Sequence, residues 1–362
     1  MRKIPWWMPK IEKGDYKFIK SALDANYVNE GPLVTKFEQQ ISRLVKSKCA
    51  VATTSGTAAI FLSLKALGIG PGDEVIVPDL TFIATANAVD LCGAKPVLAD
   101  VNPSNLNISV DAIRKAINPK TKAVVPVHVT GRGADMPAIL ALAKKHKLFV
   151  VEDAAEAFMS KQGAKFLGTI GDAGCFSFSA NKTISTGQGG MIVTDNQELC
   201  EKLRPLKDQG RPTRGTGGDD LHNTIGYNFK MTDLQAGLGL GQLEHLEQRI
   251  ARMKRNYQLY KENLRNIKGL SVFSSRPEEL PQWTDILTAK RDALEAYLKK
   301  YNMHSRKYWL PLHRQLAYKL PDSGFPNSAR LSPQALWLPS AFTLSDRDVL
   351  AVCKKIKTFF RK

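Results

Sequence analysis

The alternation of short apolar runs with helix-like segments between residues 74 and 203 constrains the fold more than any other feature of this chain. Apolar runs rich in β-branched and aromatic residues and bounded by Gly, Pro, Asn or Asp are typical of strands. We predict strands at residues 74–77, 95–100, 123–129, 148–153, 175–179 and 191–194. We predict helices at residues 82–91, 110–117, 137–146 and 197–203. Such alternation implies parallel pairing with right-handed crossovers, and therefore the α/β class.

The segments on either side extend this α/β core into two domains. Upstream we predict helices at 15–23 and 33–45, a strand at 50–52 and a helix that opens at Ser55-Gly56-Thr57. Downstream, residues 204–229 are predicted to form a loop, and one long helix is predicted from Asp233 to about Tyr257. The remaining predictions are strands near 270–273 and 283–287, a helix at 289–301, and a last helix that a capping box at Ser345 and Asp348 begins. We therefore predict a large domain with a mostly parallel sheet at 1–240 and a smaller C-terminal α+β domain at 241–362.

The charge and the cysteines narrow the function classes. A formal net charge of +18 is compatible with nucleic acid, a membrane surface or anionic small molecules as partners. The Lys and Arg residues are spread along the chain without a zinc-finger spacing or an aromatic-basic RNA motif, so we predict a solvated surface and no nucleic-acid partner. The five cysteines are widely spaced and the histidines lack metal-ligand spacing, which favours buried reduced thiols and no metal site. Pro5 and Pro9 interrupt the basic N-terminus and no apolar run could cross a bilayer, so a cytoplasmic protein without a membrane partner is expected.

Three polar features are predicted to meet at one edge of the sheet. Lys182 follows the strand at 175–179, Asp153 closes the strand at 148–153, and Ser55-Gly56-Thr57 follows the strand at 50–52. Ligands of parallel sheets collect at the carboxyl ends of the strands. A lysine in a cleft favours the neutral amine that attacks carbonyls, and small residues at a helix start suit a phosphate. Taken singly, these residues are better explained as a solvated loop lysine and a simple helix cap.

Five segments carry a resemblance to a known family. They read TSGTAA, PDLTFIATANAV, VEDAAEAF, FSFSANKTISTGQGG and GYNFKMTDLQAGLGLGQLE. In them the chain resembles the sugar aminotransferases of the DegT/DnrJ/EryC1/StrS family. These are pyridoxal-phosphate (PLP) enzymes of the aspartate-aminotransferase fold, also called fold type I. The resemblance runs over nearly the whole chain, from YVNEGP to LPSAFTLSDRD.

The resemblance implies a role for particular residues. Lys182 stands at the position of the family's Schiff-base lysine, which also moves a proton during catalysis, and Asp153 matches the carboxylate that pairs with the pyridinium nitrogen. Glu156 stands where many members have Gln, and is expected to reach the ring hydroxyl or the substrate. Phe82 matches the aromatic residue that stacks on the ring, unless it is simply a core residue. The expected phosphate ligands are Gly56, Thr57 and Ser177, together with Asn228 of the neighbouring subunit in a homodimer with shared active sites.

Two departures from the family pattern concern substrate recognition. Members often have Tyr-Gly-x-Pro where this chain has residues 129–132, and an arginine where Lys230 stands. Arg211, Arg306 and His313 are candidates for contacting a carboxylate or diphosphate, with a surface or structural role as the alternative for each.

The resemblance implies transfer of an amino group from glutamate to C4 of a nucleotide-linked 4-keto-6-deoxyhexose, on overall similarity to perosamine- and viosamine-type enzymes of polysaccharide and O-antigen biosynthesis. A C3-aminating relative that uses a 3-keto sugar is one alternative. A dehydratase of the same family is a second, although such relatives typically carry histidine where this chain has Lys182. A PLP-binding regulator that contacts DNA through its basic surface is the alternative from another class.

Overall fold

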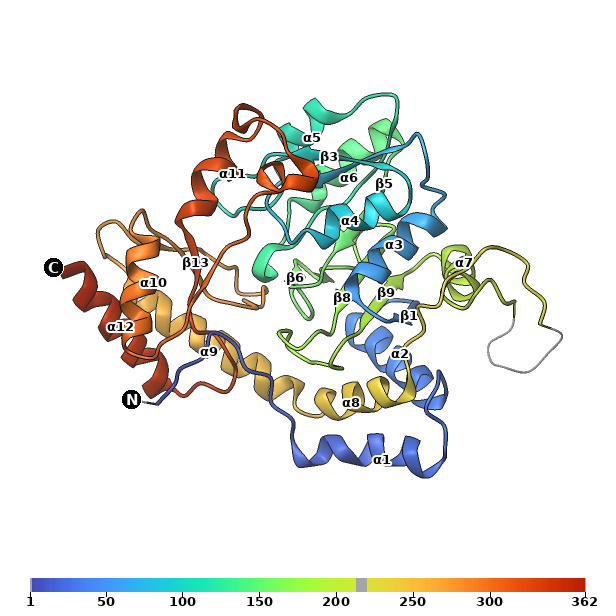
Figure 1. Cartoon of the computed structure of the whole chain (residues 1–362), viewed down its shortest axis with the longest axis horizontal. Helices are drawn as coiled ribbons and strands as arrows, with labels where there is room; N and C mark the ends of the chain where they lie inside the picture. The colour runs from blue at the N-terminus through green and yellow to red at the C-terminus, as the bar shows by residue number, and fades with distance from the viewer. Residues whose placement is uncertain (1, 213–219, 362) are drawn as a thin grey trace.

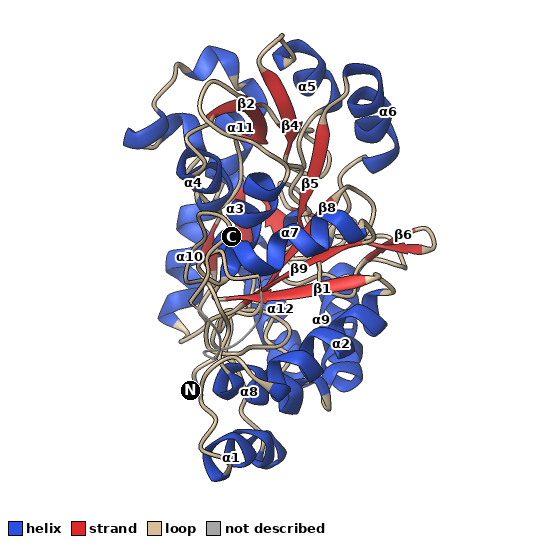
Figure 2. Cartoon of the chain, turned by 90° about the vertical axis from the view of Figure 1, so that its right-hand side faces the viewer, coloured by secondary structure: helices blue, strands red, loops and turns tan. Residues whose placement is uncertain are grey.

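Two β-sheets organise the chain in the computed structural model, which describes residues 2–212 and 220–361. The larger sheet has seven strands in the order β1-β9-β8-β5-β4-β2-β3, which Figure 2 shows in part as a twisted red array. The strands are β1 (Cys49–Thr53), β2 (Glu74–Pro78), β3 (Lys95–Ala99), β4 (Thr121–Val124), β5 (Phe149–Asp153), β8 (Ala173–Ser177) and β9 (Gly190–Thr194). A two-stranded hairpin, β6 (Lys161–Gln162) and β7 (Lys165–Phe166), lies beside it.

The prediction of a mostly parallel sheet is confirmed, and β9 is the exception to it. From β3 to β8 the neighbouring strands are parallel, but β9 runs antiparallel to both β8 and β1. The segment between β8 and β9 has no helix that could serve as a crossover, so the chain turns back beside the strand it has just left. Because β1 is antiparallel to β9, it runs in the same direction as β8. The carboxyl ends of β1, β5 and β8 therefore lie at the same edge.

Helices cover both faces of the large sheet (Figure 1). One face packs against α3 (Gly56–Ala66), α4 (Ala84–Leu91) and α7 (Gln197–Lys207), whose apolar residues share a core cluster. The other face is covered by α2 (Pro32–Val45), α5 (Val110–Ala116), α6 (Met136–His146) and α8 (Asp233–Leu243). The peripheral α1 (Tyr16–Asp24) packs on α8. The central strands are thus buried on both faces, as continuous apolar runs require.

The single helix predicted from Asp233 is two helices, α8 and α9 (Leu246–Leu264). The apolar spacing continues across the junction, but His245 has φ −105° and ψ 5° and leaves helical geometry. Gly237 and Gly241 let α8 approach the backbone near Asp15 and in α1 closely. A Cβ on Gly241 would lie only 2.5 Å from the Cα of Asp15. Close packing with small residues fixes α8 on the large sheet, and α9 continues toward the second sheet.

The second sheet has four antiparallel strands in the order β10-β11-β13-β12. Its strands are β10 (Ser271–Val272), β11 (Asp285–Leu287), β12 (Arg306–Lys307) and β13 (Ala335–Trp337), and its helices are α9, α10 (Arg291–Lys300), α11 (Pro326–Leu331) and α12 (Asp346–Arg361). Short 3-10 helices lie at Lys13–Asp15, Val129–Gly131, Leu312–Arg314, Leu316–Tyr318, Asp322–Gly324 and Ser332–Gln334. The predicted capping box is present: Asp348 N–H donates to Ser345 Oγ at 3.2 Å, and Ser345 N–H donates to Asp348 Oδ2 at 3.0 Å.

The two sheets are joined by a buried ion pair, in which Arg132 contacts both carboxylate oxygens of Asp285 at 2.7 and 2.8 Å. The start of the chain also lies beside the second sheet, because Ile4 forms an isolated β-bridge with Met303, which precedes β12. The division between the domains at residues 240 and 241 stays a prediction. Within the described part of the chain, no helix combines the length and apolar character that crossing a bilayer requires.

The prediction that all five cysteines are reduced thiols is wrong for two of them. Cys49 at the start of β1 and Cys200 on α7 form a disulfide, with their Cα atoms 6.3 Å apart. The bond closes a sequence separation of 151 residues, which spacing in the sequence could not reveal. Cys92, Cys175 and Cys353 are buried free thiols, as predicted.

Candidate active site

A cavity of about 430 Å³ lies between the carboxyl edge of the large sheet and the second sheet. It brings together eight of the residues singled out from the sequence: Gly56, Thr57, Phe82, Asp153, Glu156, Ser177, Lys182 and Arg306. These residues come from both sheets and from segments more than 200 positions apart in the chain. Their convergence on one cavity is a property of the fold, since no single motif contains them all.

Lys182 lies in the loop that follows β8, with 11% of its side chain exposed. Its Nζ atom is 3.6 Å from Oε1 of Glu156 and 4.9 Å from the ring centroid of Trp283. The second sheet and its helices hold this loop from behind: Gln282 donates to the carbonyl of Asn181, and Arg249 donates to the carbonyl of Thr183. The amino group is therefore positioned inside the cavity by both halves of the molecule.

Asp153 ends β5 and is buried beneath the cavity. The Thr85 hydroxyl donates to its Oδ2 at 2.8 Å, and the Ala155 N–H donates to its Oδ1 at 3.1 Å. Burial raises the pKa of the Asp153 carboxyl, against the opposing effect of these hydrogen bonds. A buried carboxylate of this kind is suited to a cationic partner that shares its site.

Glu156, three residues after Asp153, lies between the amino group of Lys182 and the backbone of Thr130. Its Oε2 accepts a hydrogen bond of 2.9 Å from Thr130 N–H, while its Oε1 faces Lys182. Burial raises the pKa of the Glu156 carboxyl, and the nearby Lys182 partly offsets that effect. Two carboxyl groups and one amine thus share the floor of the cavity.

The start of α3 forms a cradle with free backbone donors. The Ser55 side chain caps the helix by accepting from Ala58 N–H at 3.1 Å, and Ser55 O accepts from Ala59 N–H. Within the described residues this leaves the N–H groups of Gly56 and Thr57 without an acceptor, at the positive end of the helix dipole. A Cβ on Gly56 would lie 3.0 Å from the Cβ of Ser177, so a larger residue would close the space between them. Such a cradle is suited to a phosphate group.

Aromatic rings form the walls of the cavity. Phe82 precedes α4 and is 53% exposed, so it is not the core residue that was its alternative interpretation. Opposite it lie Trp283, Trp309 and Trp337 from the second sheet and its connections. The amine, the buried carboxyl, the exposed aromatic face and the cradle of backbone N–H donors in one cavity fit the aldehyde, ring nitrogen, ring and phosphate of PLP.

Three predicted residues lie outside the lining of this cavity. His313 is fully buried: its Nδ1 lies 2.6 Å from Oδ2 of Asp79, and its ring stacks on Phe325. Arg211 pairs with the exposed Asp220, and Asn228 is exposed on the segment that follows. Residues 213–219, in the predicted loop that precedes Asn228, lie outside the described residues.

The two departures from the family pattern also have structural partners. Arg132 is buried against Asp285, and therefore does not face the cavity. Lys230 forms an ion pair with Asp208 at the end of α7. Their substrate contacts were inferred from position alone, and in this structure both side chains serve the packing of the chain.

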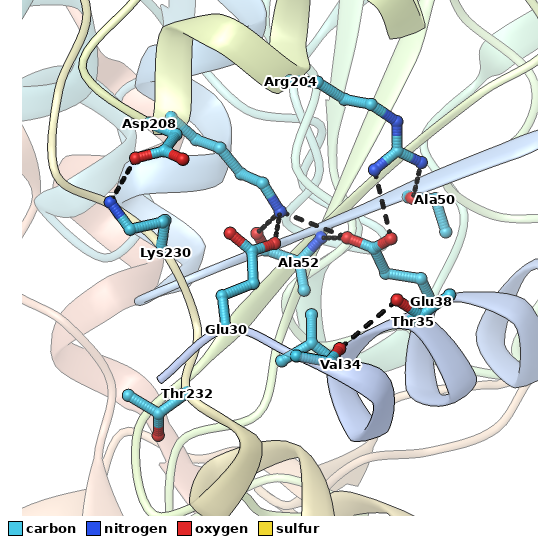
Figure 3. Close-up of polar contacts among 12 residues, drawn as sticks. Glu30, Val34, Thr35, Glu38, Ala50, Ala52, Arg204, Asp208, Lys230 and Thr232 are labelled. Carbon is cyan, nitrogen blue, oxygen red and sulfur yellow. Dashed lines mark hydrogen bonds and ion pairs between the residues drawn. The ribbon is translucent and has the colours of Figure 1, made fainter. Parts of the chain in front are cut away.

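Sequence reasoning missed a buried ionic cluster that supports the cradle (Figure 3). The amino group of Lys207 donates to Glu30 at 2.7 Å, to Glu38 at 3.2 Å and to the carbonyl of Ala52 at 3.0 Å. Glu38 also accepts from Ala52 N–H at 2.8 Å and from Arg204 at 3.2 Å. We call Glu30, Glu38, Arg204 and Lys207 the β1 clamp.

The β1 clamp acts on the strand that leads into the cradle. Ala52 lies in β1, and the next loop residue, Thr54, donates its N–H to the carbonyl of Phe229 at 3.0 Å. Phe229 N–H in turn donates to the carbonyl of Lys207. The prediction of a loop from residue 204 hid this arrangement, because α7 continues to Lys207. The charged residues Arg204 and Lys207 were the only sign of the clamp in that segment. Their partners, Glu30 and Glu38, lie far away in the sequence.

Comparison with known proteins gives matches along nearly the whole chain. A family model described as the DegT/DnrJ/EryC1/StrS aminotransferase family matches residues 9–357. The spore coat polysaccharide biosynthesis protein SpsC of Bacillus subtilis is 37% identical over 98% of this chain and 96% of its own. The GDP-perosamine synthase of Escherichia coli O157:H7 is 35% identical over 99% of both chains. The structure of DesI solved in the presence of its TDP-sugar product superposes with a TM-score of 0.91, at 30% identity over 99% of this chain and 93% of that one.

Proposed function

Because the chain belongs to the DegT/DnrJ/EryC1/StrS family of PLP-dependent sugar aminotransferases, we propose that it transfers the amino group of glutamate to C4 of a nucleotide-linked 4-keto-6-deoxyhexose. The products are 2-oxoglutarate and a 4-amino-4,6-dideoxy sugar nucleotide. The observation that carries the proposal is the position of Lys182 in one cavity with Asp153, Glu156 and the cradle at Gly56. The names of the relatives, GDP-perosamine synthase and a polysaccharide biosynthesis protein, support the sugar class.

The cofactor is proposed to occupy the 430 Å³ cavity with its phosphate at Gly56, Thr57 and Ser177. PLP supplies an aldehyde that carries the amino group and a ring that accepts the electron pair of the broken C–H bond. Phe82 would cover one face of the ring, and its exposed side chain is available for that contact. Asp153 would hold the proton on the ring nitrogen, since a buried carboxylate without a cation is costly.

Lys182 is the proposed proton carrier of the reaction. Its amino group lies inside the cavity, where it would take a proton from the donor carbon and return one to the former keto carbon. Glu156 lies 3.6 Å away and would keep that amino group oriented. The aromatic walls would reduce the access of water to the reacting carbon and so limit loss of the proton to solvent.

The test is turnover of a panel of 4-keto and 3-keto sugars linked to GDP, UDP and dTDP, with glutamate as donor. We expect stoichiometric release of 2-oxoglutarate and a 4-amino product from at least one 4-keto compound. Lys182→Ala is the control that must be inactive. Turnover of 3-keto compounds alone would contradict C4 and leave the C3-aminating alternative.

A further inference from the structure

The first residues of the chain pack behind one wall of the candidate active site. Residues 4–8, which we call the N-terminal strap, lie beside the second sheet, near α9 in Figure 1. Ile4 N–H donates to the carbonyl of Asn302 at 2.9 Å, and His304 N–H donates back to the carbonyl of Ile4 at 2.9 Å. Farther along, Ser340 N–H donates to the carbonyl of Trp6 at 3.0 Å. These backbone bonds fix the strap on the sheet.

The strap also contacts the loop that carries the lysine. The indole N–H of Trp7 donates to the carbonyl of Ala180 at 3.2 Å, two residues before Lys182. The neighbouring Trp6 packs its ring 5.1 Å from that of Trp283 and 6.0 Å from that of Trp337, measured between centroids. The rings of Trp283 and Trp337 line the cavity. Trp6 therefore stands directly behind the aromatic wall that faces Lys182.

Arg306 rests on this aromatic wall. Its guanidinium carbon lies 4.7 Å from the ring centroid of Trp6 and 5.6 Å from that of Trp337, and its side chain lines the cavity. Within residues 2–212 and 220–361, no carboxylate forms an ion pair with it, although most arginines near the second sheet have one. Ring faces alone hold its position, so its charge is available to a ligand.

We propose that Trp6 is a positioning residue of the active site, which holds Arg306 at the cavity so that its guanidinium binds the anionic oxygens of a substrate. The inference rests on the proposed function, in which both substrates are anions: glutamate has carboxylates and the sugar nucleotide has a diphosphate. A planar guanidinium pairs with either group through two parallel hydrogen bonds. Both groups present two neighbouring anionic oxygens, and the experiment distinguishes the carboxylate of glutamate from the diphosphate of the sugar nucleotide.

The indole of Trp6 is suited to this role because it orients the cation without neutralising it. A carboxylate partner would compete with the substrate, whereas a ring face leaves all the N–H donors of the guanidinium unused. An indole carries an N–H donor and no acceptor, so the rings of Trp6, Trp283 and Trp337 present no hydrogen-bond acceptor that would compete for the guanidinium. The arrangement favours an anion over a neutral or cationic ligand.

The experiment is a double-mutant cycle on the holoenzyme, with calorimetric titration of glutarate and, separately, of inorganic pyrophosphate. We expect Arg306→Met to weaken one of these probes at least 10-fold, and Trp6→Leu to weaken the same probe about 5-fold. In Trp6→Leu/Arg306→Met the probe should bind as it does to Arg306→Met alone. Trp6→Phe, which keeps a ring face, should restore most of the affinity. Met8→Ala is the matched control, since this exposed strap residue lies two positions away.

The affected probe identifies the source: glutarate for the carboxylate of the donor and pyrophosphate for the diphosphate of the sugar nucleotide. Equal binding of both probes to wild type and Arg306→Met, or no measurable binding of either probe to wild type, would overturn the proposal. The proposal would also be overturned if the fold-losses in affinity of Trp6→Leu and Arg306→Met multiplied in the double variant. Independent effects would mean that Trp6 does not act through Arg306. These titrations need no turnover, so they fail independently of the keto-sugar panel that tests the reaction.

Discussion

The amino group of Lys182 lies 3.6 Å from Oε1 of Glu156, inside the cavity that also contains Asp153. We expect the holoprotein to be yellow and borohydride to fix the cofactor covalently on Lys182. Lys182→Ala should reduce kcat by about 10² to 10⁴ or more, since it removes the proton carrier. Peptide mapping of the reduced protein checks the position. Lys165→Ala, at an exposed hairpin lysine, should be labelled like wild type, and an adduct on any lysine other than Lys182 would contradict the assignment.

The buried carboxyl of Asp153 predicts the pH dependence of apoprotein stability. Burial raises the pKa of Asp153 in the folded state, so the native protein holds the proton more strongly than the unfolded chain does. Its contribution is fully present below the unfolded pKa and is lost as pH rises through the folded pKa, at about 1.4 kcal/mol for each pKa unit. Apo Asp153→Asn should therefore lose less stability than apo wild type between pH 4 and pH 8. Thermal melts over that range check this, with the exposed Glu201→Gln as control. Parallel curves for wild type and Asp153→Asn would refute it.

Removing Lys207, the buried cation of the β1 clamp, should strongly destabilise the fold. In Lys207→Met the carboxylates of Glu30 and Glu38 stay buried without that cation, which costs on the order of 3–5 kcal/mol. Lys202→Met on the same helix removes only an exposed ion pair, and should change the free energy of unfolding by less than about 1 kcal/mol. Urea denaturation measures both. Neutralising Glu30 and Glu38 with glutamines in the Lys207→Met background should recover part of the loss, and a Lys207→Met variant as stable as Lys202→Met would exclude this role for the clamp.

The disulfide between Cys49 and Cys200 predicts a count of thiols and a stability difference. Protein unfolded without reductant should expose three thiols, those of Cys92, Cys175 and Cys353. Reduction should lower the free energy of unfolding by about 2–4 kcal/mol, because the bond restricts a long loop of the unfolded chain. The Cys49→Ala/Cys200→Ala variant should not respond to reductant. A count of five thiols in the oxidised protein would show that the bond does not form.

Shared active sites in a homodimer can be tested by complementation. Asn228 is exposed, and the carbonyl of its neighbour Phe229 accepts from Thr54 at the edge of the cradle. If Asn228 completes the phosphate site of a partner, mixing inactive Lys182→Ala with a severely impaired Asn228→Ala should restore activity through hybrid dimers, toward a quarter of the wild-type value for statistical mixing. Subunit exchange has to be demonstrated by tagged pull-down. Exchange without recovery would argue for sites contained in one chain.

The parts of the site that depend on local sequence were predictable. Lys182, Asp153 and the Ser55 cap each directly follow or close a strand, and the common edge of parallel strands brings such positions together. The apolar periodicity is also a local property, and it predicted most of the helices to within a few residues, although not the break at His245 or the short α11. Residues 55–57 needed only a helix start with small side chains, which the sequence spells out.

Features that depend on distant partners were not predictable from one sequence. Lys207 and Glu30 are 177 positions apart, and the cysteines of the disulfide are 151 apart. No periodicity reports such pairings. The imidazole of His313 suggested a substrate contact, but it is hydrogen-bonded to Asp79, which follows β2 of the large sheet. The reversal of β9 escaped prediction because strand propensity has no direction.

All five tryptophans of the chain, Trp6, Trp7, Trp283, Trp309 and Trp337, belong to one connected group of rings that forms and backs one wall of the cavity. The intrinsic fluorescence of this protein therefore comes from a single place. A cofactor that absorbs near 400 nm and sits within a few ångströms of this group would quench the whole emission by energy transfer, so cofactor loading can be followed optically without a label. Because α1, α5 and α6 contain no tryptophan, a change in tryptophan fluorescence reports on the surroundings of the cavity and not on these helices.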